Sequence, residues 1–296
     1  MKIAVLMSTY NGERFLEKQL KSLAGQTVIE NMTVYVRDDA SSDNTLEIIE
    51  KWKKIMDLKY VKGDNRGPAK SFWSLLHDDT IQADYYAFCD QDDIWDPDKL
   101  ETAIKHLNEN CLYACNCRII DTCDKVIEAK RRLQPPCITI PNLFVSGVTQ
   151  GCAMVFTNDL RKYICSKNIK TIPMHDNIVM LYALSYGNVY WDPTPHFSYR
   201  FHERNVVANK KRGASQAFKT VKRWKRNSQN SLADVAHELL ENASSLSDSD
   251  KVYLRALSNY KKSFKDKFFA LRYFNNADVN KSALQSYKIR LLANML

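Results

Sequence analysis

The first 110 residues alternate between short apolar runs and segments with amphipathic helical spacing. The apolar runs, each short enough for one buried strand, are Lys2–Met7, Thr33–Val36, Leu58–Val61 and Tyr85–Cys89. The helical segments that follow them are Glu13–Ala24, Asp43–Ile55, Ala69–Leu76 and Asp98–Leu107. Such alternation is typical of βαβ units, so the sequence predicts an α/β protein with a mainly parallel, Rossmann-like sheet flanked by helices.

Polar clusters follow three of these runs, at Ser8–Gly12, Asp38–Asp43 and Asp90–Asp93. Right-handed crossovers bring the carboxyl ends of parallel strands to one edge, where α/β proteins bind ligands. The third cluster, Asp90-Gln91-Asp92-Asp93, places three carboxylates within four positions, and their mutual repulsion disfavours ionisation. A divalent ion such as Mg²⁺ or Mn²⁺ removes this penalty and also binds phosphates. The alternative is an acidic turn that caps the helix beginning near Pro97.

Two common nucleotide-binding loops are missing. The first strand is not followed by G-x-G-x-x-G, and the chain has no G-x-x-x-x-G-K-[ST] sequence. A bound nucleotide would therefore be held by carboxylates and a metal rather than by a glycine-rich loop.

Composition and length set wider limits. The chain has 296 residues, 45% of them hydrophobic, which allows one large domain or two smaller ones. The sequence contains no apolar run as long as a bilayer span. The N-terminal apolar run is too short for the hydrophobic region of a signal sequence, so we expect a cytoplasmic protein. Four of the eight cysteines cluster at Cys111, Cys115, Cys117 and Cys123. Their spacing favours reduced thiols over a zinc site.

The net charge of +9 is concentrated in the last third of the chain. From Glu203 onward there are 19 Lys or Arg and 8 Asp or Glu, whereas the first 202 residues carry a net charge of −2. Residues 210–226 hold eight basic residues and no acid, and Ala217, Phe218, Val221 and Trp224 recur at 3–4 residue spacing. This pattern fits a basic amphipathic helix on an anionic membrane surface and, equally, a helix packed on the protein with a solvated basic face.

The three clusters and several later motifs together resemble family 2 glycosyltransferases with the GT-A fold. The matching motifs are Ser8–Gly12, Asp38–Thr45, Asp90–Asp93, Gln150-Gly151-Cys152, His175-Asp176, and Tyr199–His202 with Asn205. Asp90–Trp95 and the run from Tyr199 to Val207 are most similar to a bacterial rhamnosyltransferase-like group. The resemblance implies a catalytic domain over 1–207, with a nucleotide-sugar half at about 1–110 and an acceptor half at about 111–207. A helical, basic C-terminal region would follow over 208–296.

The resemblance also implies roles for individual residues. Asp39 would accept a hydrogen bond from the pyrimidine N3–H of the donor, although Asp38 and Asp39 could instead only cap their turn. Asp92 would bind the metal, Mn²⁺ or Mg²⁺, together with Asp90 and His202. The nucleotide and its phosphates would be contacted by Thr9, Tyr10, Asn11, Asp39, Arg66, Lys70, Asp90 and Arg200.

The acceptor side has its own expected residues. Asp176 would act as the general base that takes the proton of the acceptor hydroxyl. His175 would either tune Asp176 or cap the helix that begins there. The sugar and acceptor pocket would be formed by Trp95, Gln150, Gly151 and His175.

The expected function is an inverting transfer of a sugar, with rhamnose one candidate, from a dTDP- or UDP-sugar. The acceptor would be a saccharide or a lipid-linked saccharide in bacterial surface polysaccharide (capsule) synthesis, in the cytoplasm or on the inner face of the plasma membrane. The C-terminal helices offer a surface for a homodimer. The competing hypotheses are a sugar nucleotidyltransferase, which normally needs a glycine-rich basic loop, and a nucleic-acid-binding protein that uses the basic tail. The latter leaves the acidic loops unexplained, so we expect no nucleic-acid partner.

Overall fold

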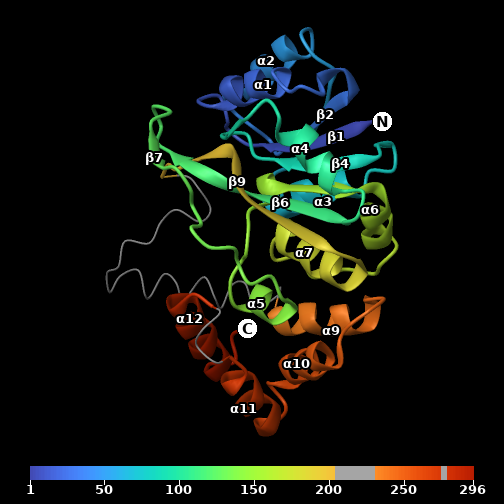
Figure 1. The fold of residues 1–296 in the computed structure, drawn as a ribbon, viewed down its shortest axis with the longest axis vertical. Coiled ribbons are helices and arrows are strands. Elements are labelled where there is room, and N and C mark those ends of the chain that lie inside the picture. The colour runs from blue at the N-terminus through green and yellow to red at the C-terminus, as the bar shows by residue number, and fades with distance from the viewer. Residues whose placement is uncertain (204–230, 275–278) are drawn as a thin grey trace.

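The computed structural model describes residues 1–203, 231–274 and 279–296, in which one mixed sheet lies between two layers of helices (Figure 1). This described part contains nine strands in the order β3-β2-β1-β4-β8-β6-β9-β5, with β7 paired to β6. The strands are β1 Ile3–Thr9, β2 Met32–Asp38, β3 Leu58–Lys62, β4 Tyr85–Cys89, β5 Ile94–Trp95, β6 Leu112–Ile120, β7 Val126–Glu128, β8 Met154–Thr157 and β9 Val189–Arg200.

Parallel pairing dominates the N-terminal half of the sheet. Strands β3, β2, β1 and β4 are parallel neighbours, and β6 pairs in parallel with β9. The antiparallel strand β8 joins the two groups by pairing with both β4 and β6. The α/β fold expected from the alternating pattern, a sheet of mainly parallel strands flanked by helices, is therefore confirmed, and the polar clusters after β1, β2 and β4 share one edge.

Alternate side chains of β1 enter two different cores. Ile3, Val5 and Met7 pack toward one face of the sheet, and Ala4 and Leu6 pack toward the other. The first face is covered by helices α1 Leu16–Ala24, α2 Thr45–Trp52 and α4 Lys99–His106. The second face is covered by α3 Pro68–Leu76, α5 Ile140–Val145, α6 Asn158–Cys165 and α7 His175–Tyr186. Two short 3₁₀ helices, Ile29–Asn31 and Gly151–Ala153, complete this part.

The C-terminal helices extend the second core. They are α9 Leu232–Asn242, α10 Asp248–Asn259, α11 Phe264–Arg272 and α12 Lys281–Leu292, and they lie beyond α5 and α7 at the far end of the molecule from α1 and α2 (Figure 1). Leu239 and Leu257 belong to the same buried cluster as Leu143 and Ile178. The carboxylate of Glu238 on α9 accepts the backbone N–H of Thr171 at 3.1 Å and its hydroxyl at 2.7 Å. In the described ranges, the helices are too short or too polar to cross a membrane.

The middle of the chain differs from the sequence prediction in detail. The sequence predicts two short strands, at Asn188–Trp191 and Phe197–Phe201. In the structure β9 is one strand, in which Pro193 and Pro195 fall at register shifts against β6. Helices α5 and α6 were not expected, and each begins at a threonine cap. All eight cysteines are free. The basic segment 210–226 and Asn205 lie outside the described residues.

Candidate active site

The loops after β1 and β2 are tied together by side-chain hydrogen bonds. The Thr9 hydroxyl donates to Asp38 at 2.9 Å. Asn11 donates its backbone N–H to the Ser41 hydroxyl at 2.9 Å, and its side-chain oxygen accepts the Ser42 N–H at 2.9 Å. Asp38 thus holds the turn, as one of the two sequence interpretations of this carboxylate required.

Asp39 is buried and faces the loop that follows β3. Its carboxylate accepts backbone N–H groups from Arg66 at 3.0 Å and Gly67 at 2.8 Å, and it forms an ion pair with Arg37. Arg37 comes from the same strand and also donates to the Ser71 hydroxyl at 3.1 Å. The oxygens of Asp39 are therefore oriented by charge-assisted bonds at the strand edge where a pyrimidine is expected.

Gln91 connects the β1 loop to the acidic run. Its side-chain oxygen accepts the Tyr10 N–H at 2.9 Å, and its side-chain nitrogen donates to the Tyr10 carbonyl at 3.1 Å. A Cβ on Gly12 would lie 2.3 Å from that side-chain oxygen, so a larger residue there would displace the Gln91 amide. The side chains of Tyr10, Arg66 and Lys70 are exposed, which leaves them available to a ligand.

The carboxyls of Asp90, Asp92 and Asp93 repel one another, as expected from their spacing. Burial, and then the Asp92 charge, raises the pKa of Asp90 to about 7. Burial, followed by the charges of Asp92 and Asp90, raises the pKa of Asp93 well above its ordinary value. Asp90 keeps some solvent exposure while Asp93 has none, so the stronger effect on Asp93 is physically reasonable. The Asp176 charge also raises the pKa of Asp90, which places Asp176 near the run.

Arg200, at the end of β9, contacts the acidic run through its backbone and its side chain. Its backbone N–H donates to Asp93 at 3.1 Å, its Nε donates to the Asp92 carbonyl at 2.8 Å, and its side chain pairs with Asp124. The side chain is fully buried, so in this arrangement it positions the run. The predicted contact of Arg200 with phosphate stays a prediction.

His202 lies against the same run from the chain that leaves β9. Its Nε2 is 2.6 Å from Oδ2 of Asp92, and its ring packs 5.2 Å from that of Phe15. The structure thus brings together two of the three predicted metal ligands, Asp92 and His202, which are 110 residues apart in the sequence.

A hard divalent ion fits this donor set. Carboxylate oxygens of Asp90 and Asp93 and the sulfur of Cys152 lie within 4.8 Å of one another, and Oδ2 of Asp93 is buried without a partner among the described residues. Burial raises the pKa of Cys152 well above its usual value, which keeps it a thiol and a poor ligand. The carboxylates of Asp90 and Asp93 remain in this group, and carboxylate oxygens are the ligands that Mn²⁺ and Mg²⁺ prefer.

Asp176 lies in the first turn of α7, on the acceptor side of the acidic run. Its carboxylate accepts the Asn177 N–H at 2.7 Å. Burial raises the pKa of Asp176 to about 6 despite its backbone hydrogen bonds. A carboxylate with such a pKa is ionised at neutral pH and is a stronger base than an ordinary aspartate.

His175 neither caps α7 nor carries a charge. Its ring stacks on Phe72 at 4.1 Å and meets Phe88 edge-on at 4.7 Å, and burial lowers its pKa to about 3. A Cβ on Gly151 would come within 2.7 Å of Nε2 of His175 and 3.4 Å of Cβ of Asp176. Gly151, His175 and Asp176 therefore form one tightly packed unit.

The other predicted pocket residues are less open to a ligand. Trp95 is buried, and the Lys99 Nζ sits 3.4 Å from the centroid of its ring system. Gln150 directly precedes Gly151, and its side-chain nitrogen is buried with no partner in the described part of the chain. Trp95 thus packs in the core next to the acidic run. The side-chain N–H groups of Gln150 have no acceptor among the described residues.

Three residues without an assigned role from sequence belong to this arrangement. Gln91 and Asp93 belong to the acidic run, so the sequence predicted that they lie at the site. It did not predict which residues they contact. Arg37 has no sequence signal, because only the turn of the chain after β2 brings it against Asp39.

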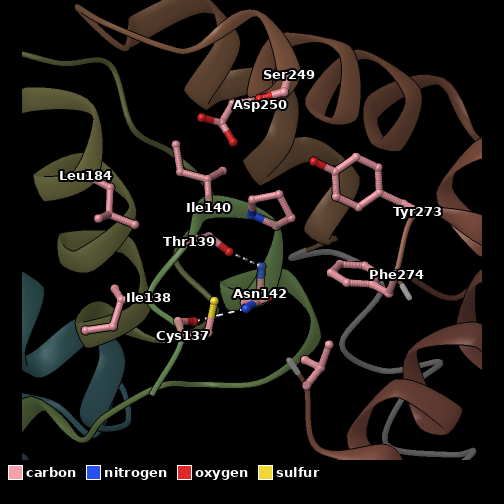
Figure 2. A pocket seen from close by; sticks show the side chains of 12 residues that line it. Cys137, Ile138, Thr139, Ile140, Asn142, Leu184, Ser249, Asp250, Tyr273 and Phe274 are labelled. Carbon is pink, nitrogen blue, oxygen red and sulfur yellow. Dashed lines mark hydrogen bonds between the residues drawn. The ribbon is translucent and has the colours of Figure 1, made fainter. Parts of the chain in front are cut away.

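One cavity among the described residues lies away from this site. This cavity has a volume of about 540 Å³ and lies between the start of α5, α10 and the end of α11. Its lining includes Ile138, Asn142, Asp250 and Tyr273 (Figure 2). Its lining includes none of the predicted site residues. The candidate site is instead defined by the converging side chains at the sheet edge.

Comparison with known proteins agrees with this geometry. The family model described as glycosyl transferase family 2 matches residues 4–164. The dTDP-rhamnosyl transferase RfbG of Shigella flexneri is 33% identical over 229 residues, which cover 72% of this chain and 75% of that protein. The chain belongs to glycosyl transferase family 2. It is a glycosyltransferase with the GT-A-like fold that its motifs suggested.

Solved structures of two other glycosyltransferases have a similar fold. Staphylococcus aureus TarS, residues 1–349 in complex with UDP-GlcNAc, superposes with a TM-score of 0.63 at 19% identity, covering all of this chain and 80% of that one. A Pyrobaculum calidifontis mannosyltransferase with GDP-Man and Mn²⁺ gives a TM-score of 0.52 at 15% identity, covering 99% and 86%. In sequence, TarS is 32% identical over 37% of this chain but only 19% of its own length.

Proposed function

We propose that this family 2 glycosyltransferase is a metal-dependent, inverting enzyme. It transfers a sugar, with rhamnose the first candidate, from a dTDP- or UDP-linked donor to a saccharide or lipid-linked saccharide acceptor. The observation that carries the proposal is the convergence of Asp90, Asp92 and Asp93 with Asp176 at one sheet edge, where burial raises the pKa of Asp90 and Asp176. The similarity to a dTDP-rhamnosyl transferase over 72% of the chain supports the donor class.

Each side of the site has a distinct task in this proposal. Asp39 fixes the pyrimidine, and Thr9, Tyr10, Asn11, Arg66 and Lys70 surround the nucleotide. Asp92, Asp90 and His202 hold Mn²⁺ or Mg²⁺, which when bound offsets the charge on the leaving diphosphate. The backbone N–H of Arg200 fixes Asp93 behind these ligands, where burial and the charges of Asp92 and Asp90 favour its protonated form.

The chemical step is assigned to Asp176. Its carboxylate accepts the proton of the acceptor hydroxyl while the hydroxyl oxygen forms a bond to the anomeric carbon. The bond from that carbon to the donor phosphate oxygen breaks, and the nucleoside diphosphate leaves with the electron pair. A single displacement of this kind inverts the anomeric configuration, and it needs one base within hydrogen-bond reach of the acceptor.

The biological setting follows from the relatives and is also part of the proposal. The Bacillus subtilis relative TuaG, 29% identical over 38% of this chain, is described as a putative teichuronic acid biosynthesis glycosyltransferase. We place this protein in bacterial surface polysaccharide synthesis, such as capsule assembly, on the cytoplasmic side of the membrane. A homodimer through the C-terminal helices and the absence of a nucleic-acid partner stay predictions.

Donor turnover tests the function directly. The protein is incubated with Mn²⁺, Mg²⁺ or EDTA and with dTDP-rhamnose, UDP-GlcNAc or GDP-mannose, and nucleoside diphosphate release is measured. We expect release from a dTDP- or UDP-sugar that EDTA abolishes. Release that is equally fast in EDTA would remove the metal role. Formation of nucleotide sugar and pyrophosphate from a sugar phosphate and a nucleoside triphosphate would show a nucleotidyltransferase instead.

A further inference from the structure

Helix α11 turns three aromatic side chains toward solvent. Phe264 is 92% exposed, Phe268 is 58% exposed and Phe269 is 37% exposed. Phe264 and Phe268 are four residues apart, so they project from the same face of the helix. Single exposed apolar residues are common on proteins, but neighbouring aromatic rings on one helix mark an interaction surface.

The way α11 is anchored explains this orientation. Its one buried residue is Ala270, and the Ser263 hydroxyl caps the helix by accepting the Asp266 N–H at 3.2 Å. Lys267 donates to the Asn294 side chain at 2.7 Å, which ties the helix to the end of α12. Ala270, Leu271 and these polar contacts therefore hold α11 in place, and its three phenylalanines are left facing outward.

The aromatic rings are surrounded by positive charge. Residues 261–272 contain five basic side chains and one acid, a net charge of +4, the bases being Lys261, Lys262, Lys265, Lys267 and Arg272. The Arg272 guanidinium lies 5.0 Å from the centre of the Phe268 ring. These bases form no ion pair with an acid in the described part of the chain.

We propose that this surface, the α11 face of residues 261–272, docks the protein on an anionic lipid bilayer. Phe264, Phe268 and Phe269 enter the boundary between headgroups and acyl chains. The lysines and Arg272 lie at the level of the lipid phosphates, where positive charge is attracted to an anionic leaflet. The surface differs from the basic segment 210–226, and the inference does not depend on the transfer reaction.

Charge favours a bilayer over a second copy of the chain. In a two-fold symmetric dimer the same patch meets itself, so two surfaces of net charge +4 would face each other. An anionic bilayer offers both an apolar layer for the rings and phosphates for the bases.

The position of α11 is also suited to docking. It lies at the opposite end of the long molecular axis from α1 and α2 (Figure 1). A bilayer that contacts α11 therefore leaves the nucleotide-binding end of the sheet away from the lipid.

Vesicle flotation tests the proposal with the full chain and no donor present. The vesicles contain phosphatidylcholine alone or with about one third phosphatidylglycerol. The test variant carries Phe264→Ser and Phe268→Ser. The matched control carries Leu133→Ser and Ile127→Ser, two apolar side chains that are 86% and 57% exposed elsewhere on the protein. The segment 210–226 is unchanged in every variant.

We expect the wild type and the control to bind the anionic vesicles, and the test variant to bind at least tenfold more weakly. A third variant, Lys261→Gln with Lys262→Gln and Lys265→Gln, should lose the preference for anionic lipid. Unchanged thermal unfolding of all variants would show that folding is intact, since the substituted side chains are exposed.

Three results would overturn the proposal. The first is equal vesicle binding by the test variant and the wild type. The second is a shift from dimer to monomer by sedimentation in the test variant, with no vesicle binding by the wild type. The third is binding of a single-stranded oligonucleotide, in place of vesicles, that depends on the same phenylalanines.

Discussion

Two physical effects act in opposite directions on the carboxyl of Asp176. The N-terminus of α7 and the hydrogen bond from Asn177 favour the carboxylate, whereas burial favours the protonated form. Burial prevails and raises the pKa to about 6. The Asp176 carboxyl is thus mainly ionised at neutral pH and becomes protonated in mild acid, as the proposed role of general base requires.

The first prediction concerns this base. With donor, acceptor and Mn²⁺ saturating, kcat should fall about tenfold per pH unit below pH 6, because only ionised Asp176 can take a proton. Asp176→Asn should lower kcat by about 10² to 10⁴-fold while nucleoside diphosphate still binds. Both are measured by a pH series of transfer rates and by calorimetric titration. An asparagine variant that retained the acid limb would show that another group is the base.

The second prediction concerns the charge of the acidic run. Because the folded-state pKa of Asp90 is raised, its protonated form stabilises the fold, and this stability is lost as pH rises through about 7. At pH 8 without metal, Asp90→Asn should therefore raise the melting temperature by a few degrees. Mn²⁺ should raise the melting temperature of the wild type more than that of the variant.

Thermal unfolding at pH 6 and pH 8, with and without Mn²⁺, measures both effects. Glu109→Gln is the control, since Glu109 is exposed and lies outside the site. If Asp90→Asn lowered the melting temperature at pH 8 without metal, the ionised Asp90 carboxylate would stabilise the fold, contrary to this prediction.

At this scale the sequence predicted which residues converge better than it predicted their contacts. The spacing of Asp90, Asp92 and Asp93 identified the acidic run, but the burial of Asp93 depends on how β5 pairs with β9. Arg200 was expected at the phosphates, and its complete burial depends on carbonyl partners from distant segments. Local sequence carries little information about such long-range partners.

At the scale of elements, the short 3₁₀ helix at Gly151 and the start of α7 must approach very closely. His175 is held between Phe72 and Phe88 and has no room to yield to a new methyl group at Gly151. Small-to-large changes in such packing cost about 1–3 kcal/mol.

The third prediction is that Gly151→Ala displaces Asp176. A Cβ 2.7 Å from Nε2 of His175 forces the two segments apart, so kcat should fall at least tenfold with a smaller change in the KM for donor. Gly147→Ala is the control, because a Cβ there meets no atom within 4 Å. Both variants are tested by steady-state kinetics. Equal kcat values would mean that His175 moves aside without displacing Asp176.

The elements themselves were predicted most accurately where the pattern is regular. Strands β1 to β4 and their helices follow clear apolar periodicity up to about residue 107. Beyond that point two short strands were predicted where β9 runs as one, and register shifts against β6 accommodate the prolines at 193 and 195. The short helices α5 and α6 carried too few turns to show a period.

For the whole molecule, the C-terminal helices and the sheet share one buried cluster. Leu239 of α9 lies with Leu143 and Ile178 of the catalytic part, and Glu238 accepts hydrogen bonds from Thr171. The sequence suggested a boundary near residue 207 from the change in charge and pattern. Such a change in charge indicates a different surface. It does not show whether the residues before and after it share one hydrophobic core.

The last prediction follows from this shared core. Leu239→Ala removes a fully buried side chain and should lower the free energy of unfolding by about 2–5 kcal/mol. Trp52, Trp73, Trp95 and Trp191 lie in the catalytic part, so tryptophan fluorescence reports mainly on that part. If the core unfolds as one unit, the fluorescence midpoint in urea should shift together with the midpoint of far-ultraviolet circular dichroism. His237→Ala, an exposed position on the same helix, should leave both midpoints unchanged. A fluorescence midpoint that stayed at the wild-type value while the helical signal shifted would instead mean that the region before residue 208 is stable without the helices packed on it.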